Sequence, residues 1–458
     1  MQQFQAPFSA FISCLPGLEP LLLKEVECLR SQWSKDDHNA KNANTQPQIL
    51  QGGVKIILPS LHHLYILHLY LGTASHIYLR LNDDNVEGLP PLFRARGFPE
   101  LQRKVKDLIV SQRWNEWLTN DGHTGKEDSS INLQVHVITS KSKLMHTKAV
   151  EERMKQNIGE VIPSIRDNDG GSETKAQHTI RLMARINRDV VQLSLDTSHT
   201  PLHRRGYRLK PHKAPLREDL AYALLMSGGL MPRWDLRPQF GSVATESSTL
   251  LERRERILFD PCCGSGTIAI EGASIQLGLP PGRFRPPPLE GTSFCNPALW
   301  EEMKSNALSV SSAEGDNIRV AACDIDPKAL DAAKANAKRA GVEHSIDFFK
   351  GSFVLHPFVK QQPNPSKKMS DSLDEIKSLL VVANPPYGRR LSPKNTTQNT
   401  IYRKLANSLL SSSRSIDCAI IGSDVRVMRG SGLPLEVAYS TKHGGLNVAA
   451  MTGTLSKE

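Results

Sequence analysis

Apolar positions in the second half of the chain form short runs that alternate with stretches of helical spacing. Buried strands are predicted to end near 260, 323, 349, 384 and 421, and helices are predicted at 267–277, 297–308, 327–340 and 400–410. Two further apolar segments, 435–439 and 446–451, flank His443-Gly-Gly445 and predict a terminal hairpin. Strands that alternate with helices and finish in a hairpin predict an α/β fold, a doubly wound parallel sheet with an antiparallel edge.

The first half of the chain mixes the two periods in a less regular order. Strands are predicted at 8–14, 52–58, 76–81, 131–138 and 189–195, and helices at 18–29, 61–71, 101–118 and 148–161. Polar stretches at 34–48 and 120–130 predict loops. This pattern favours small α+β modules ahead of the α/β domain.

Size and composition narrow the class of protein. At 458 residues the chain is too long for one compact core. A net charge of +10, with a pI near 9.2, favours a polyanionic partner. Seven cysteines without a Cys-x-x-Cys pair favour neither a disulfide framework nor a zinc site. Without an apolar run of membrane length or a signal-peptide pattern, we expect an intracellular protein in a reducing compartment: the cytoplasm, with the nucleus or an organelle left open.

The loop Asp260-Pro-Cys-Cys-Gly-Ser-Gly266 follows the first predicted strand of the α/β domain. It lacks the glycine spacing of a dinucleotide fingerprint and the Gly-Lys-Ser/Thr of a phosphate loop. Its glycines let the backbone approach a ligand, and Asp260 can bind an ammonium group. Asp324, after the next strand, can accept hydrogen bonds from both hydroxyls of a ribose. A ligand with an amino-acid end and a nucleoside end but no phosphate is S-adenosylmethionine.

A second loop, Asn384-Pro-Pro-Tyr387, follows another buried strand. The amide oxygen of Asn384 and the carbonyl of Pro385 can accept both protons of an exocyclic amine on a base. This makes the nitrogen more tetrahedral and directs its lone pair toward a methyl donor. Tyr387 offers a face on which the base can stack. A structural proline-rich turn is the alternative interpretation.

Two basic segments are candidates for RNA contact. Lys141, Lys143 and Lys148 precede or begin a predicted helix, where side chains and free N–H groups can bind phosphate together. A second segment interleaves basic residues with an aromatic ring, as single-stranded RNA requires. Its candidates are Arg204, Arg205, Tyr207, Arg208 and Arg217. A solvated helix start and a charged linker explain the two segments equally well.

Taken together, these motifs resemble RNA guanine-N2 methyltransferases that carry a THUMP domain, the group of the bacterial large-subunit rRNA enzyme and related tRNA enzymes. The shared stretches are Cys14–Glu25, Gly52–Val54, Leu202–Arg208, Ala214–Glu218, Asp260–Thr267, Asp324–Asp326 and Asn384–Leu391. The resemblance implies a ferredoxin-like domain over 8–70, a THUMP domain over 71–198 and a class I, Rossmann-like methyltransferase domain over 199–458. It implies RNA as the partner, with a small activating protein subunit as a further candidate.

The resemblance also implies the residues of the site. Catalysis is expected from Asn384, Pro385 and Tyr387. Cofactor contacts are expected from Asp260, Cys262, Gly264, Ser265, Gly266, Thr267, Asp324, Ile325, Ser352 and Asn384. Where the family usually has an acid for the adenine amine, this chain offers only Ser352, and 361–377 forms an insertion.

Several activities stay open at this point. The chain ends after one such domain, so one reaction is expected: methylation of the N2 amine of a guanosine in rRNA or tRNA. An adenine-N6 or glutamine methyltransferase is the alternative within the class, because any planar amine suits the Asn-Pro-Pro-Tyr loop. A catalytically silent RNA-binding protein is the alternative from another class.

Overall fold

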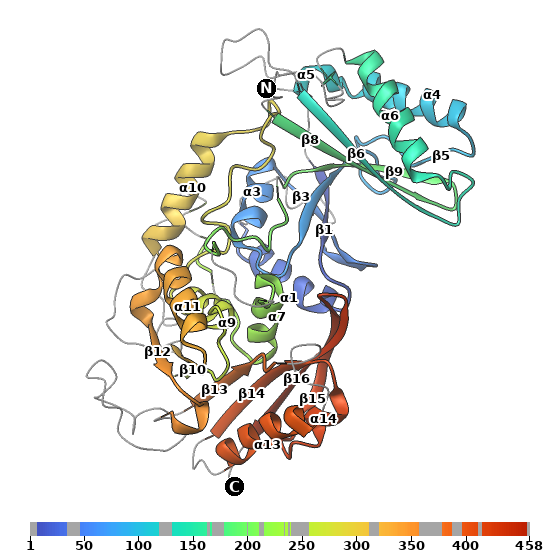
Figure 1. The fold of residues 1–458 in the computed structure, drawn as a ribbon. Helices are drawn as coiled ribbons and strands as arrows, with labels where there is room; N and C mark the ends of the chain where they lie inside the picture. The colour runs from blue at the N-terminus through green and yellow to red at the C-terminus, as the bar shows by residue number, and fades with distance from the viewer. Residues whose placement is uncertain are drawn as a thin grey trace.

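A computed structural model describes most of the chain. The described residues are 7–33, 46–118, 131–162, 165–166, 178–198, 200–209, 215–232, 234–236, 239, 256–310, 320–356, 378–386, 396–410 and 415–455. Within them, two sheets lie in the upper and lower parts of the molecule, and helices surround each (Figure 1).

The first sheet joins both N-terminal modules. Its strands are β1 (Phe8–Ser13), β2 (Gln48–Leu50), β3 (Gly53–Leu58), β4 (His76–Arg80), β5 (Phe93–Arg94), β6 (Ile131–Ser140), β7 (Ile165–Arg166), β8 (His178–Asn187) and β9 (Val190–Asp196). They follow the order β2-β3-β1-β4-β9-β8-β6-β7, with β5 beside β9. Strand β1, before residue 70, pairs with β4, after it. One sheet therefore includes strands from both sides of the position where the sequence suggested a domain boundary.

The buried apolar side chains of this sheet lie on one of its two faces. Cross-strand pairing aligns Ala10 with Leu79, Leu79 with Leu195, Leu195 with Leu182 and Leu182 with Val135. These residues are buried. Because side chains alternate between the faces of a strand, the intervening residues form a second, opposite face.

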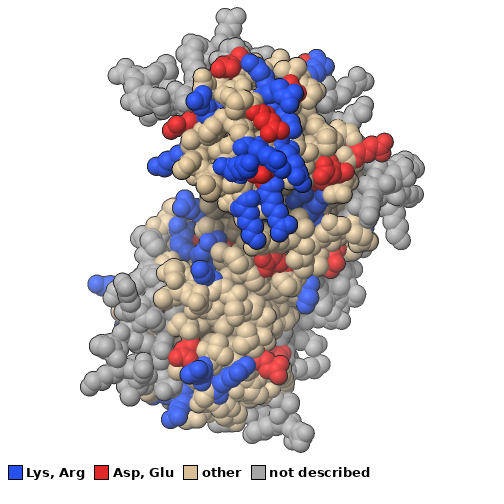
Figure 2. All heavy atoms as spheres, turned by 90° about the vertical axis from the view of Figure 1, so that its right-hand side faces the viewer, with Lys and Arg blue, Asp and Glu red and all other residues tan. Residues whose placement is uncertain are grey.

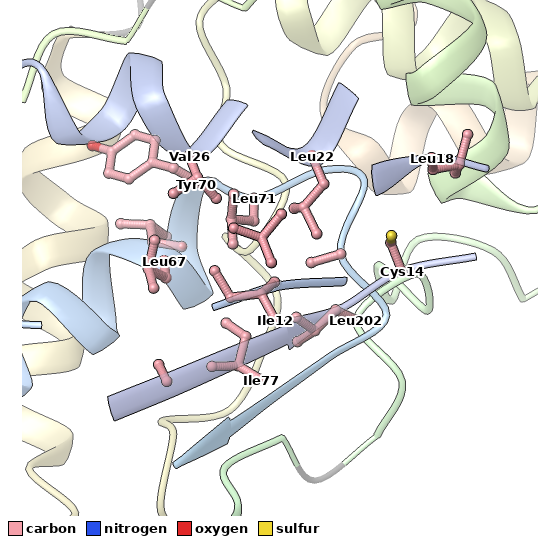
Figure 3. Close-up of a cluster of buried hydrophobic side chains, with 14 of the residues drawn as sticks. Ile12, Cys14, Leu18, Leu22, Val26, Leu67, Tyr70, Leu71, Ile77 and Leu202 are labelled. Atoms are coloured by element: carbon pink, nitrogen blue, oxygen red, sulfur yellow. The ribbon is translucent and has the colours of Figure 1, made fainter. Parts of the chain in front are cut away.

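Helices cover the apolar face of the first sheet. They are α1 (Glu19–Arg30), α3 (Leu61–Tyr70), α4 (Phe98–Ser111), α5 (Trp114–Leu118) and α6 (Thr147–Val161). Figure 3 shows Leu22 and Val26 of α1 and Leu67 of α3 around Ile12 and Ile77 of the strands. Leu202, from the segment after β9, joins the same cluster.

The second sheet is the α/β domain. Its strands are β10 (Arg256–Asp260), β11 (Val320–Asp324), β12 (Ile346–Lys350), β13 (Ser378–Ala383), β14 (Ser415–Gly422), β15 (Glu436–His443) and β16 (Leu446–Leu455). Their order is β12-β11-β10-β13-β14-β16-β15, and β10 to β14 are parallel. The terminal hairpin pairs antiparallel to β14. The predicted α/β fold with an antiparallel edge is confirmed.

Both faces of the second sheet are buried. The helices of the domain are α7 (Glu218–Ser227), α9 (Thr267–Gln276), α10 (Pro297–Val310), α11 (Pro327–Ala340), α13 (Thr396–Leu410) and α14 (Val425–Arg429), with short 3-10 turns η2 (Glu343–Ser345) and η3 (Phe353–Leu355). Leu258 and Leu380 pack in the core that contains α7 and α9, whereas Phe259 and Val381 pack in the core that contains α13. Buried side chains thus alternate between the faces along each strand.

Among the elements of ten or more residues, two regions differ from the sequence-based expectation, and the short elements β2, β5, β7 and α14 were not predicted. The strand β8 was not predicted, although Ile180, Leu182, Ala184 and Ile186 alternate with polar residues and are buried. The single helix expected over 101–118 is divided into α4 and α5 at Arg113, whose φ of 51° lies in the left-handed region. In the described part of the chain, no helix combines the length and apolar character that a membrane crossing requires.

Arg205 joins the two halves of the molecule from a fully buried position. Its guanidinium donates to the carbonyl of Leu202 at 2.7 Å and to that of Gly72 at 2.5 Å, and it pairs with Glu271 of α9 at 3.5 Å. Arg285 donates to the same Leu202 carbonyl at 2.7 Å. A buried charge is tolerated only when it is paired and hydrogen-bonded, and Arg205 meets both conditions.

We expect Arg205→Ala to lower the free energy of unfolding by about 3 to 5 kcal/mol, because it removes the buried cation that pairs with Glu271 and the donor to the Gly72 carbonyl. Urea unfolding followed by circular dichroism measures the change. The control is Arg204→Ala, an exposed neighbour that should stay within about 0.5 kcal/mol of the parent protein. Equal stability of the two variants would contradict this role for Arg205.

Candidate functional site

A cavity of about 660 Å³ opens at the carboxyl ends of the parallel strands. This is where open α/β sheets bind ligands. The expected residues that line it are Cys262, Gly264, Ser265, Thr267, Asp324, Ile325, Ser352 and Asn384. The structure therefore brings the two predicted loops together in one site, although residues 60 to 120 positions apart supply it.

Backbone hydrogen bonds hold the first loop against the neighbouring strand. The amide of Cys263 donates to the carbonyl of Cys323 at 2.9 Å, and the amide of Gly264 donates to the Asp324 carboxylate at 2.9 Å. Gly264 has a φ of 53°, and a Cβ placed there would meet no atom within 4 Å. Its surface is open, so a ligand can approach the backbone directly.

Gly266 connects the loop to helix α9 and does not line the cavity. Its φ of 84° is left-handed, and a Cβ would lie 3.0 Å from the Cβ of Ala333 on α11. Its role is therefore close packing of α9 against α11. Gly266 is the N-cap of α9, whose first two residues, Thr267 and Ile268, line the cavity.

Asp324 serves two backbone segments at once. One carboxylate oxygen accepts from Gly264, and the other accepts from the amide of Asp326 at 2.9 Å. Asp326 in turn caps α11 by accepting from the amide of Lys328 at 2.9 Å. Each carboxylate oxygen can accept a second hydrogen bond, so Asp324 is fixed in place and still able to bind hydroxyl groups.

Asp260 lies beneath the loop, fully buried, and does not line the cavity. One of its oxygens accepts from the amide of Cys262 at 3.2 Å. The other has no hydrogen-bond partner among the described residues. Burial, with a smaller contribution from the nearby Asp324, raises the pKa of Asp260 to about 8. A cationic group bound above the loop would favour its ionised form.

The second loop presents Asn384 at the end of β13. Asn384 lines the cavity, and its buried amide oxygen has no hydrogen-bond partner within the described residues. Pro385 is buried beside it, and Pro386 lines the cavity. Tyr387 lies outside the described residues. A buried acceptor without a partner is costly, and it is typical of a site that binds a donor.

The basic stretch after β9 requires a correction. Arg205 and Tyr207 were predicted to bind RNA, but both are buried: 2% and 3% of their surface is exposed. The Tyr207 hydroxyl donates to Glu271 at 2.8 Å, and Arg205 has the internal partners described above. These side chains cannot contact RNA without unfolding, so for them the prediction is wrong.

The other arginines of this stretch differ in exposure. Arg208 is mostly buried and donates to the carbonyl of Leu216 and to the Thr267 hydroxyl, each at 2.8 Å. Arg208 therefore supports the wall of the cavity. It was predicted to bind RNA, but little of its side chain is exposed to solvent. Arg217 pairs with Asp219 at 2.6 Å, and Arg204 is exposed.

Lys141, Lys143 and Lys148 are exposed. They lie at the end of β6 and the start of α6, in the upper module of the molecule. Figure 2 shows Lys and Arg side chains gathered on this upper part, above a hollow that separates it from the lower part. Their arrangement is compatible with the predicted phosphate contacts.

Sequence reasoning missed several residues of the cavity wall. Leu216 comes from the segment before α7, Phe353 from η3, and Ile401 and Lys404 from α13. The spacing of three between Ile401 and Lys404 places both on one side of a helix, which is a detectable signal. Leu216 belongs to the shared stretch Ala214–Glu218, in which only Arg217 was predicted to contact a ligand.

Within the described residues, His, Cys, Asp and Glu nowhere form a group of three or more suited to a metal ion. The lining of the cavity supplies backbone amides, carboxylates, the Asn384 amide, hydroxyl groups, the Lys404 side chain and apolar walls. Such a set can hold a polar organic cofactor against an amine-bearing substrate.

Known proteins share this architecture. The chain is 26% identical over 98% of its length to the ribosomal RNA large subunit methyltransferase K/L of Legionella pneumophila (strain Corby), and 29% identical over 96% to that of Saccharophagus degradans. It spans 53% and 50% of those proteins, about half of their length. The crystal structure of SMU.472 complexed with SAH has the same fold, with a TM-score of 0.70, 18% identity and coverage of 99% of this chain and 100% of that one.

A family model locates the likeness within the chain. Residues 248–429 match the methyltransferase domain described as RMKL-like. This range contains β10 to β14 and every cavity-lining residue named above except Leu216. The α/β part of the chain is therefore similar in sequence to this methyltransferase domain.

Proposed function

We propose that the protein transfers a methyl group from S-adenosylmethionine to the N2 amine of a guanosine in RNA. The observation that supports this most directly is Asn384, whose amide oxygen has no hydrogen-bond partner among the described residues and lies in the same cavity as Asp324 and Gly264. A hydrogen-bond acceptor for an amine and a loop suited to a nucleoside thus share one site.

The residues of the cavity fit S-adenosylmethionine, which supplies a methyl group activated on a positively charged sulfur. Asp324 would accept from the ribose hydroxyls, because its two oxygens keep free lone pairs. Gly264 would let the backbone lie against the ligand, and Asp260 would balance the ammonium group. Ile325, 75% exposed, and Phe353 would cover the adenine, with Ser352 beside them. The crystal structure of SMU.472 with SAH supports this choice of cofactor.

The chain's own groups would prepare the amine. An exocyclic amine is a weak nucleophile because its lone pair is delocalised into the ring. Accepting its protons at the Asn384 oxygen and the Pro385 carbonyl localises the lone pair and directs it. The prolines restrict the backbone around these acceptors. Such preorganised acceptors require no rearrangement as charge develops on the nitrogen.

RNA is the proposed substrate for two reasons. Relatives in Legionella and Saccharophagus are ribosomal RNA methyltransferases, and the modules before the methyltransferase domain carry exposed lysines. We propose that 8–70 and 71–198 are ferredoxin-like and THUMP modules that hold the RNA, while 199–458 performs the reaction. A small activating protein remains part of the proposal.

Nucleoside mass spectrometry tests the function as a whole. The purified protein is incubated with S-adenosylmethionine carrying a deuterated methyl group and with rRNA and tRNA fractions from cells that lack it. We expect labelled N2-methylguanosine. Label in N6-methyladenosine alone would replace guanine by adenine as the target, and the absence of label from both RNA fractions would contradict the proposed function.

Asn384→Ala should lower turnover about a hundredfold or more, because the amine loses an oriented acceptor. Cofactor affinity should change little. Single-turnover methylation measures the rate, and calorimetric titration with S-adenosylhomocysteine measures the affinity. A variant with the parent rate would exclude Asn384 from the chemistry.

Asp324→Ala should weaken cofactor binding by about 1.5 to 3 kcal/mol, the usual size of hydrogen bonds to a charged group. The change also frees the amide of Gly264, so the loop loses one anchor. Asp331→Ala, an exposed acid on α11, is the control and should bind as the parent does. If the two variants bind cofactor equally, another group holds the ribose.

Replacing Lys141, Lys143 and Lys148 together with Ala should weaken RNA binding with little dependence on sequence. It should also reduce the salt dependence by about one log unit for each lost phosphate contact. Filter binding at several salt concentrations measures both effects. The control removes the same charge from the lower domain, at the exposed Lys334, Lys338 and Lys350. Identical slopes for the two triple variants would assign these lysines another role.

A further inference from the structure

Asp260, the last residue of β10, is a carboxyl group in an interior that does little to stabilise its charge. The residue is fully buried. One oxygen accepts from the amide of Cys262 at 3.2 Å, and the other has no hydrogen-bond partner in the described part of the chain. A carboxylate that leaves water without a cation or a full set of donors is costly, and such a group takes up a proton instead.

The groups that surround Asp260 supply no positive charge among the described residues. From β11, Asp324 faces it as a second carboxylate. From α9, the amide of Ala269 in the first turn lies near it. The last residues of β13, on the other side of β10, are apolar. The nearby thiols are neutral because burial raises the pKa of each; they are those of Cys262, Cys263 and Cys323.

Asp324 has more hydrogen-bond donors than Asp260. The amides of Gly264 and Asp326 donate to its two oxygens at 2.9 Å each, and its side chain is only half-buried. Two neighbouring carboxylates without a cation favour a shared proton, and the contrast in donors and burial assigns it to Asp260. Burial, and to a smaller extent Asp324, accordingly raises the pKa of Asp260 to about 8, although two backbone amides act in the opposite direction.

A cation bound above the loop would reverse this preference. The ammonium group of S-adenosylmethionine carries the charge that the surroundings of Asp260 lack. An opposite charge within roughly 4 to 6 Å lowers the pKa of a carboxyl group by about 1 to 3. Starting from about 8, a decrease of this size leaves Asp260 at least half ionised at pH 7.

We propose that Asp260 carries a proton in the cofactor-free protein and releases it to solvent when the ammonium group of S-adenosylmethionine binds above the loop. The proposal rests on the cofactor of the proposed function. It makes the affinity for that cofactor depend on pH through a single buried residue, which lies outside the lining of the cavity.

The sign of the pH dependence follows from the protonation of Asp260 in the two states. Below the pKa of the bound carboxyl, Asp260 is protonated with and without cofactor, so pH has no effect through it. Above about 8, it is ionised in both states. Between these limits binding removes a proton, and a rise in pH therefore strengthens binding.

The test is calorimetric titration of the full chain with S-adenosylhomocysteine, which carries the same ammonium group. Titrations at pH 7 in phosphate and in Tris, whose ionisation enthalpies differ, give the number of protons released. We expect the parent protein to release roughly 0.4 to 0.9 proton more than Asp260→Asn, since the amide has none to release. The amino group of the ligand contributes equally to both proteins and cancels in the difference.

The affinity provides a second readout of the same titrations. Between pH 6 and pH 7, the parent should bind S-adenosylhomocysteine roughly twofold to eightfold more tightly as the pH rises. The affinity of Asp260→Asn should change by less than about 1.5-fold, because only the amino group of the ligand still titrates.

Asp326→Asn is the matched control. Asp326 also lines the cavity, but its carboxylate accepts from the amide of Lys328 at 2.9 Å as the N-cap of α11, a role that asparagine can fill. This variant should release as many protons as the parent. Thermal melting verifies that both variants are folded.

Infrared difference spectra of the parent protein need no variant, so they decide the matter if Asp260→Asn does not fold. The carbonyl band of a protonated carboxylic acid should disappear when S-adenosylhomocysteine is added at pH 7. The corresponding carboxylate bands should appear at the same time.

The outcomes separate this proposal from the proposed function. Equal proton release by the parent and Asp260→Asn, or an acid band that the ligand leaves unchanged, would overturn the role of Asp260 while RNA methylation stands. Release that is lost in Asp260→Asn and kept in Asp326→Asn supports it. If the parent releases the proton yet methylates no RNA, the role of Asp260 stands and the proposed function fails. A parent protein that does not bind S-adenosylhomocysteine would contradict both.

Discussion

The buried guanidinium of Arg205 connects the N-terminal part of this protein to helix α9 of the α/β domain. A charge in the interior must have partners, and those of Arg205 come from three places: the turn after α3, the segment after β9 and helix α9. Glu25 of α1 reinforces the same turn by accepting from the amides of Gly72 and Thr73 at 2.6 and 3.1 Å. Helix α9 begins where the cofactor loop ends. The contacts of Arg205 therefore fix the position of the loop 260–266 relative to the N-terminal module.

A second set of contacts carries this constraint to the cavity. Tyr207 binds Glu271 in the middle of α9, and Arg208 binds Thr267 at its start. The carbonyl of Leu216, a residue of the cavity wall, accepts from the same Arg208 nitrogen. Arg208 thus connects two parts of the cavity wall, Thr267 and Leu216. Asp260 and Asn384 each have a buried oxygen without a hydrogen-bond partner in the described part of the chain, and the proposed ligands would supply donors near both.

Local chemistry explains what the sequence could predict. Helix α11 was expected over 327–340 and occupies those residues, because Pro327 and Gly341 mark its ends and its apolar period is regular. The loops 260–266 and 384–387 could be predicted because the residues that give each its chemistry are consecutive in the sequence. Strand β8 was missed because the apolar Met183 interrupts its alternation of apolar and polar residues. Leu216 and Lys404 reach the cavity only through tertiary packing, which no local pattern reveals.

The arginines show why composition misleads about partners. The segment Leu202–Arg208 was interpreted as an RNA contact because its charges interleave with an aromatic residue, yet Arg205 and Tyr207 are interior groups. Arg285, from a proline-rich stretch, is also buried. A net charge of +10 therefore includes cations that no polyanion can reach. What a polyanion can reach is decided by exposure, and this property separates Lys141, Lys143 and Lys148 from the buried arginines.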